Sequence, residues 1–388
     1  MDHRGKRVKI GILTIEEFAF RLYGGFGFVA RKTASLLRHL GYDVSIIDCG
    51  SQHKGNLEFL DGIPVHFLLN RTVRLGPIEE SLIAKAFLKK TSFDIVIAIC
   101  VSSNCGKWVY YFKRASPEVK SLIWFQDVRT VDDWKKILRI PLPGCGPGSP
   151  FFFQHERYSN FIRMMAIRKA DGLITQAQLI NPKIKKLYKT ENVSLVSNPI
   201  PIPEEKDIRK QDEPLVVFLG RIDPIKRPWI YARIAMNLPD IQFLVLGTTH
   251  FPAIMDQVME KYKKIENLKF LGLTVGKQKE EILSRAWVLV NTSIYESLPV
   301  SFLEALSYKM AILSCQNPDS ITSRYGFYTG EPFGFGFHET QRFVSGLQYL
   351  LSSARWMEKG EKGYEFVKDF ADERKIAGKL DKILNRLE

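Results

Sequence analysis

The sequence repeats one pattern in both halves: an apolar run, a loop, a helical stretch and another apolar run. In the first half, residues 8–13 form a short β-rich run. A glycine-containing loop follows at 23–27, and a helical pattern then ends at Gly41 before the next apolar run at 44–47. A helix between two apolar strands is a βαβ unit, whose strands lie parallel in a sheet with helices on both faces. This pattern restricts the chain to doubly wound α/β folds.

The alternation restarts after residues 198–214, a charged segment that contains four prolines and is typical of an interdomain linker. Two domains are therefore predicted, one over residues 1–198 and one over 199–370, each with an open parallel sheet. The strands expected in the second domain are 215–219, 243–246, 268–271, 288–291 and 311–314. Ligands of such sheets bind at the carboxyl ends of the strands, so a cleft between two facing sheets is the expected site.

Composition agrees with a globular chain of this size. Of 388 residues, 45% are hydrophobic and 25% are charged, which is enough for two cores. The longest apolar run, 95–101, is too short to span a bilayer, which takes about 20 residues. The five cysteines are odd in number and form no Cys-x-x-Cys pair, so neither a disulfide framework nor a zinc site is predicted. With a polar N-terminus that does not resemble a signal peptide, this indicates a cytoplasmic location.

The most informative motif runs from Glu296 to Glu304, directly after the predicted strand 288–291. Pro299 suits the first turn of a helix, so the preceding residues would present backbone N–H groups to an anion at the helix N-terminus. Glu296 would lie at the mouth of this site and Glu304 two turns into the helix. The alternative is structural: Ser301-x-x-Glu304 fits a capping box, and Glu296 could be an ordinary loop carboxylate.

A second motif, from Gly220 to Lys226, follows the first strand of the second domain. Arg221 and Lys226 would lie at the carboxyl end of that strand, where a diphosphate could accept forked contacts from the Arg and charge from the Lys. The alternative is a solvated basic turn. A third motif, Gly24-Gly25, follows the first strand, and its lack of side chains would allow close approach of a phosphate or sugar. It lacks the full Gly-x-Gly-x-x-Gly fingerprint, because Ala30 replaces the third glycine.

In combination, these motifs resemble the family-four retaining glycosyltransferases of GT-B architecture, the glycosyl transferases group 1. The segment 170–176 and Asn198-Pro199-Ile200, at the hinge position, also resemble that family. The resemblance covers nearly the whole chain and implies two Rossmann-like domains that face a cleft, with an N-terminal acceptor domain and a C-terminal donor domain. It also implies that residues 371–388 form a helix that packs back on the N-terminal domain.

The resemblance implies roles for individual residues. Arg221 and Lys226 would clamp the diphosphate, Glu296 would hold the transferred sugar, and Glu304 would bond the ribose. The remaining donor-binding residues would come from four loops: Gly24, Gly25, Gly220, Gly247, Leu273, Ser297, Leu298 and Pro299.

On the acceptor side the sequence departs from the family. Many relatives carry a His-Asp pair where this chain has Gln126-Asp127. Gln126 can hydrogen-bond a sugar hydroxyl but cannot relay a proton, and Asp127 could position the acceptor. Two further departures, Lys309-Met-Ala311 and Asn317-Pro-Asp319, replace glycine-containing positions. The predicted catalytic set is therefore Glu296, Asp127, Lys226 and Arg221.

The expected reaction moves a hexose from a UDP- or GDP-sugar to a glycan or lipid-linked acceptor with retention of configuration. No metal or other cofactor is expected, because the cations and the helix N-terminus would stabilise the leaving diphosphate. No Asp-x-Asp motif follows a strand, and Asp132-Asp133 is predicted to begin a helix.

The net charge of +14 favours anionic partners. Candidate acceptor surfaces are Arg71 to Arg74, Lys85 to Lys90 and the aromatic and basic segment Phe151 to Lys169. The last suits a peripheral membrane contact or, equally, a core helix with basic ends. Two other classes remain open: a nucleotide-sugar epimerase or hydrolase of the same fold, and a nucleic-acid-binding protein. The latter is disfavoured because the basic residues are spread out and no nucleic-acid module is present.

Overall fold

The structure is a computed structural model that describes residues 7–15, 24–49, 57–68, 77–99, 103–140, 161, 163–249, 251–333 and 336–387. The chain forms two compact units. Unit 1 comprises residues 1–128, 150–199 and 373–388, and unit 2 comprises 129–149 and 200–372. The candidate surface Arg71 to Arg74, the loop 141–150 and residues 151–160 of the aromatic and basic segment lie outside the described residues.

The sheet of unit 1 has the strand order β3-β4-β2-β1-β5-β6-β7-β8. All described neighbours pair parallel except β3 and β4, which form an antiparallel hairpin. The strands are β1 (Lys9–Thr14), β2 (Asp43–Asp48), β3 (Leu57–Leu60), β4 (Ile63–Phe67), β5 (Ile95–Ile99), β6 (Lys120–Phe125), β7 (Gly172–Thr175) and β8 (Ser194–Leu195). The burial of β1, β5 and β6 explains their near-continuous apolar sequences.

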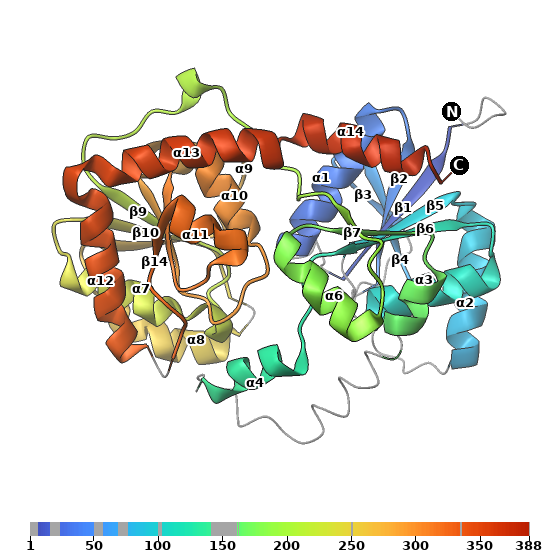
Figure 1. The fold of residues 1–388 in the computed structure, drawn as a ribbon, viewed down its shortest axis with the longest axis horizontal. Coiled ribbons are helices and arrows are strands. Elements are labelled where there is room, and N and C mark those ends of the chain that lie inside the picture. Colours follow the sequence, from blue (N-terminus) through green and yellow to red (C-terminus); the bar gives the residue numbers. More distant parts are fainter. Residues whose placement is uncertain are drawn as a thin grey trace. The chain divides into compact units, whose positions relative to one another are not determined.

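Helices cover both faces of this sheet, with α1 beside α14 and α2 beside α3 (Figure 1). They are α1 (Gly25–His39), α2 (Pro77–Thr91), α3 (Ser103–Ala115), η1 (Gln178–Ile180), α6 (Asn181–Tyr188) and α14 (Glu373–Leu384). Residues 163–169 are also helical. Helix α1 ends as predicted, with Gly41 in the left-handed region at φ 95°.

The sheet of unit 2 is parallel throughout the described strands, in the order β11-β10-β9-β12-β13-β14. Its strands are β9 (Leu215–Leu219), β10 (Gln242–Leu246), β11 (Leu268–Gly272), β12 (Val288–Asn291), β13 (Ala311–Ser314) and β14 (Gly326–Tyr328). From β9 the chain proceeds outward through β10 and β11, and from β12 it proceeds the other way. The direction of winding therefore reverses between β9 and β12.

The helices of unit 2 pack on both faces of its sheet, with α7 beside α12 and α10 beside α13 (Figure 1). They are α4 (Val131–Arg139), η2 (Glu205–Asp207), η3 (Pro224–Lys226), α7 (Pro228–Asn237), α8 (Pro252–Met259), η4 (Glu260–Tyr262), α9 (Gly276–Arg285), α10 (Val300–Ser307), η5 (Pro318–Ser320), α11 (Ile321–Arg324), α12 (Phe337–Leu351), η6 (Ser352–Ala354) and α13 (Arg355–Phe370). Over the described ranges, no helix combines the length and the apolarity needed to cross a bilayer.

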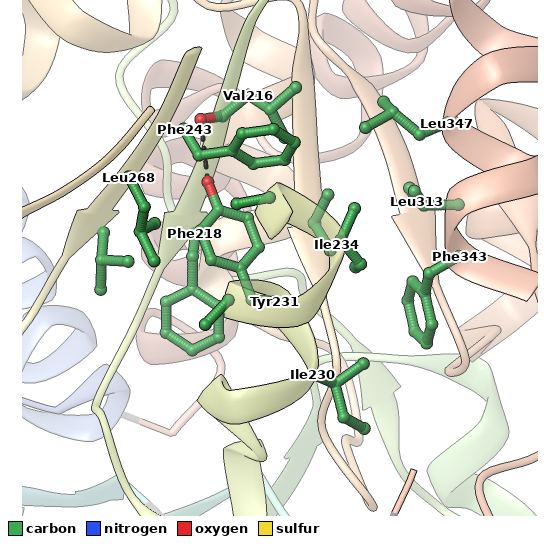
Figure 2. Packing of buried hydrophobic residues seen from close by; sticks show 14 of the residues in the cluster. Val216, Phe218, Ile230, Tyr231, Ile234, Phe243, Leu268, Leu313, Phe343 and Leu347 are labelled. Atoms are coloured by element: carbon green, nitrogen blue, oxygen red, sulfur yellow. Dashed lines mark hydrogen bonds between the residues drawn. The ribbon is translucent and has the colours of Figure 1, made fainter. Parts of the chain in front are cut away.

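The core of unit 2 is centred on Tyr231 of α7, which lies against the sheet beside Phe218 and Phe243 (Figure 2). The Tyr231 hydroxyl donates to the carbonyls of Val216 (2.9 Å) and Leu244 (3.0 Å). A fully buried phenol is tolerated because its polar atom has partners. This packing fixes α7, and with it the loop that connects β9 to α7.

The predicted fold class is confirmed: the chain contains two doubly wound parallel-sheet α/β units. One segment is placed differently from the sequence-based division. That division puts residues 129–140 with the rest of 1–198 in the N-terminal domain, but in the structure they group with unit 2. Residues 373–387 pack on unit 1, where the Tyr42 hydroxyl donates to Asp381 and Lys32 pairs with Glu373.

Candidate active site

The loops that follow β9 and β12 carry the charged residues singled out in the sequence. Because these strands are neighbours at the point where the winding reverses, their carboxyl ends open into the crevice where ligands of such sheets bind. The Ile294 amide donates to the Ile225 carbonyl at 2.9 Å, which joins the two loops directly. The Thr292 hydroxyl also donates to the Lys226 carbonyl at 2.6 Å. The fold thus brings the predicted Lys226 and Glu296 together.

Lys226 and Glu296 form an ion pair between the Lys Nζ and the Glu Oε1. Asn291, the last residue of β12, donates to the same Glu oxygen at 3.2 Å. Burial would raise the pKa of Glu296, but the charge of Lys226 and hydrogen bonds from Lys226, Ser293 and Asn291 outweigh burial and hold this pKa below its ordinary value. Glu296 is therefore an anion held in a fixed orientation, not an ordinary loop carboxylate.

Arg221 lies on the same loop as Lys226 and is oriented by a buried acid. Its Nε is 3.3 Å from the carboxylate of Asp223, which also accepts a hydrogen bond from the Thr249 hydroxyl at 3.2 Å. The Arg221 side chain is 36% exposed, whereas Asp223 is 3% exposed. A guanidinium held at its base by a buried carboxylate keeps other N–H donors for an anion.

Helix α10 begins at Val300, with Pro299 as its N-cap and no side-chain cap. Pro299 therefore precedes the first turn, and Glu304 lies in the second turn. The capping-box alternative for Ser301 and Glu304 is wrong, since Glu304 instead pairs with Lys279 of α9, the Nζ–Oε1 distance being 2.5 Å. Because no side chain caps α10, its N-terminal amides remain available to an anion.

Three glycines close the ends of β9, β10 and β11. The Gly220 amide donates to the Leu246 carbonyl at 3.0 Å, and the Gly247 amide donates to the Gly272 carbonyl at 2.8 Å. A Cβ built on Gly247 would lie only 1.9 Å from the Gly220 oxygen, and the φ of Gly247 is +152°. Glycine is therefore required at Gly247 for two strand ends to approach each other. Leu273 follows β11 with 41% of its surface exposed.

The predicted residues of unit 1 follow β1 and β6, between which β5 lies. Gly24 is the N-cap of α1 and Gly25 its first residue, so the helix starts within the predicted loop 23–27. Gln126 is buried, and its backbone carbonyl accepts a hydrogen bond from the Gln176 side chain. Asp127 is half-buried. The predicted site residues thus divide between the units, with Gly24, Gly25, Gln126 and Asp127 in unit 1 and the others in unit 2.

Residues 202–322, most of unit 2, match the family model described as glycosyl transferases group 1. This match includes the loops of Lys226 and Glu296, and the structure has the two-unit fold of solved glycosyltransferases. The chain is a GT-B glycosyltransferase.

Its relatives are distant in sequence. One subunit of the human phosphatidylinositol N-acetylglucosaminyltransferase is 24% identical to this glycosyltransferase over 162 residues, a match that covers 40% of this chain and 32% of the relative. Among solved structures, sucrose-phosphate synthase from Thermosynechococcus elongatus superimposes with a TM-score of 0.75 at 16% identity, covering 98% of this chain and 99% of that one. Anabaena HepE in complex with UDP and glucose gives 0.71 at 12% identity, covering 98% and 100%.

Two charged residues of the glycosyltransferase were not singled out from the sequence. Lys279 pairs with Glu304 across 25 positions, and the fully buried Arg227 pairs with Glu339 across 112. Arg227 also donates through Nε to the Thr292 carbonyl at 2.9 Å. Arg227 directly follows Lys226, so its anchoring fixes the end of the Lys226 loop. Only a charged residue next to the motif hinted at this, because such long-range pairs leave no periodic signal.

Proposed function

We propose that this glycosyltransferase moves a hexose from a UDP- or GDP-sugar to a glycan or lipid-linked acceptor, with retention of configuration and without a metal ion. The observation that carries the proposal is the joining of Lys226 and Glu296 at the carboxyl ends of β9 and β12. A cation, an anion and a helix N-terminus meet there, which matches the charges of a nucleotide-diphosphate sugar.

Each charged group has a task in this proposal. Arg221, Lys226 and the N-terminal amides of α10 bind the diphosphate. Glu296 binds hydroxyls of the hexose, and Glu304 binds the ribose hydroxyls next to Lys279. The glycines at 220 and 247 allow the backbone to approach the nucleotide, with Leu273 beside its base. The Lys226–Glu296 pair preorganises both side chains before the donor arrives.

In the proposed reaction, the bond between the anomeric carbon and the diphosphate oxygen breaks, and the electron pair remains on that oxygen. The acceptor hydroxyl attacks the same face of the sugar, and its proton passes to the departing phosphate oxygen. Positive groups fixed around that oxygen stabilise the developing charge, which is the part that a metal ion would otherwise serve. Asp127 and Gln126 orient the acceptor, and neither needs to become a covalent nucleophile.

The similar proteins support this choice of substrates. HepE was solved with UDP and glucose, which supports a UDP-hexose donor. The human relative is named for N-acetylglucosaminyl transfer to phosphatidylinositol, which supports a lipid-linked acceptor. We also propose a cytoplasmic location with a peripheral membrane contact. The free thiols of Cys49, Cys105 and Cys315 suit a reducing compartment, and co-sedimentation with anionic vesicles tests the contact.

The test begins with thermal-shift screening against UDP, GDP and their hexose conjugates, because a bound nucleotide stabilises the native state by mass action. With the donor known, Lys226→Ala is expected to lower kcat/KM at least about tenfold, or about 1.4 kcal/mol of barrier. Lys263→Ala, which removes an exposed lysine of unit 2, is the control. Turnover of Lys226→Ala within about threefold of wild type would refute the diphosphate clamp. Release of free sugar without any acceptor product would indicate a hydrolase instead.

A further inference from the structure

Residues 129–140 leave unit 1 after β6 and fold onto unit 2. Thr130 begins α4 with a capping box: its backbone N–H donates to the Asp133 carboxylate at 2.7 Å, and the Asp133 amide donates to the Thr130 hydroxyl at 3.2 Å. This confirms that Asp132-Asp133 begins a helix. The helix is therefore anchored at its start, close in sequence to Asp127, the last residue of the motif that follows β6.

Helix α4 packs on the two loops of the candidate site. Ile137 and Ile140 form a buried cluster with Ile294, and Trp134, Ile225 and Tyr295 pack against it. Ile225 immediately precedes Lys226, and Tyr295 immediately precedes Glu296. The same two loops are joined by the hydrogen bond from Ile294 to Ile225. The helix thus contacts both loops at the residues next to the ion pair.

Arg129 connects the beginning of this segment to the Glu296 loop. Its guanidinium carbon is 4.6 Å from the centre of the Trp134 ring and 4.9 Å from the centre of the Tyr295 ring. A planar guanidinium stacks on aromatic faces in a way that a lysine ammonium cannot reproduce. The side chain that follows Asp127 by two positions is therefore held against the side chain that precedes Glu296.

We infer that Arg129 is a positioning residue that couples the acceptor side of the enzyme to its donor loop. Two residues of extended chain span at most about 7 Å, so Asp127 cannot move far from Arg129 without breaking the stack on Tyr295. A shift of the Glu296 loop is accordingly transmitted through Tyr295, Arg129 and the backbone to Asp127. The roles of Glu296 and Asp127 in this inference rest on the proposed function; the coupling itself does not.

The coupling is tested by hydrogen exchange on the full chain without substrate, comparing peptides that cover 293–297 and 124–128. Arg129→Met keeps the length of the side chain and removes its planar charge. It is expected to speed exchange in both peptides at least about threefold. Tyr295→Leu is expected to speed exchange in 124–128 as well, although it lies in the other unit by sequence. Lys136→Met, which removes an exposed lysine of α4, is the matched control and should leave both peptides unchanged.

Two outcomes overturn the inference. Either Arg129→Met matches the Lys136→Met control in both peptides, or Tyr295→Leu changes only its own loop, which would show local packing without coupling. Activity gives a second readout. In Arg129→Met, nucleotide affinity should stay within about threefold while kcat for transfer falls about tenfold and KM for the acceptor rises, with Arg129→Lys no better than Met. Equal kcat and KM in Arg129→Met and wild type would refute the coupling, whereas a wild-type chain that binds no nucleotide would refute the proposed function alone.

Discussion

The guanidinium of Arg227 and the carboxylate of Glu339 form a fully buried pair that joins the end of the Lys226 loop to the first turn of α12. Both terminal nitrogens of Arg227 bond to the carboxylate, Nη2 to Oε1 at 3.0 Å and Nη1 to Oε2. Neither side chain is more than 2% exposed. Removal of one partner from such a pair leaves an uncompensated buried charge.

Glu339→Ala is therefore expected to lower the free energy of unfolding by about 3–5 kcal/mol, and Arg227→Met/Glu339→Leu should recover much of that loss. Chemical denaturation of each variant measures the change. Glu260→Gln, which breaks the exposed pair with Lys263, is the control and should cost less than about 1 kcal/mol. A Glu339→Ala variant as stable as this control would contradict the assignment.

Glu296 makes a pH prediction of definite sign. Its folded pKa lies below the ordinary value of 4.5, so it stabilises the fold above that pH. Relative to Glu296→Gln, the wild type should lose stability as the pH falls below about 4.5. In Lys226→Met the opposing cation is gone and burial raises the pKa, so stability should instead increase as the pH falls from neutrality. Unfolding curves across pH decide, and profiles of the same slope with and without Lys226 would disprove the coupling.

Lys210 in the linker gives a second profile. Its amine donates to the carbonyls of Leu283, at 3.3 Å, and Ala286 at the end of α9. Burial, followed by the charge of Lys309, lowers the pKa of Lys210 from 10.5 to about 7. Between these values the unfolded chain binds more protons than the folded one, so stability rises with pH across that window.

The stability of the wild type relative to Lys210→Met should thus increase between pH 7 and 10 by up to about 1.4 kcal/mol per pH unit. Lys206→Met is the matched variant for the loss of one linker lysine. A constant difference between wild type and Lys210→Met over this range would contradict the lowered pKa.

Gly247 and Gly378 should respond to alanine in opposite directions. At Gly247 a Cβ would lie 1.9 Å from backbone, so Gly247→Ala is expected to cost more than about 2 kcal/mol of stability. Gly378 lies within α14 with no atom within 4 Å of the added Cβ, so Gly378→Ala should stabilise by about 0.5–1 kcal/mol. Thermal unfolding of both variants checks the signs. Equal effects would mean that the contact between β9 and β10 ends is not tight.

The buried strands were the most predictable part of the fold. The boundaries predicted for 215–219, 288–291 and 311–314 are those of β9, β12 and β13, because apolar runs bounded by polar loops leave few alternatives. The hairpin partner β3 was not predicted: the four residues Leu57–Leu60 carry little periodicity, and their pairing with β4 depends on a tertiary contact. Helix α3 was not predicted either.

The candidate site was predictable as residue types and strand ends, but not as pairings. Lys226 and Glu296 could each be placed after a strand, whereas their ion pair depends on β9 and β12 becoming neighbours. The Lys279–Glu304 pair and the attachment of α4 to unit 2 depend on packing between elements far apart in sequence. Local patterns do not encode such contacts, so only the three-dimensional structure reveals them.

The attachment of α14 to unit 1 has a consequence for synthesis on the ribosome. Ile376, Leu380 and Leu384 are buried, and Tyr42 and Lys32 of the first helix and its exit bond to this last helix. The unit that emerges first therefore waits, with an apolar surface uncovered, until unit 2 has been translated and released. During that interval the nascent chain exposes its greatest hazard of aggregation, and a chaperone that shields α1 would act there.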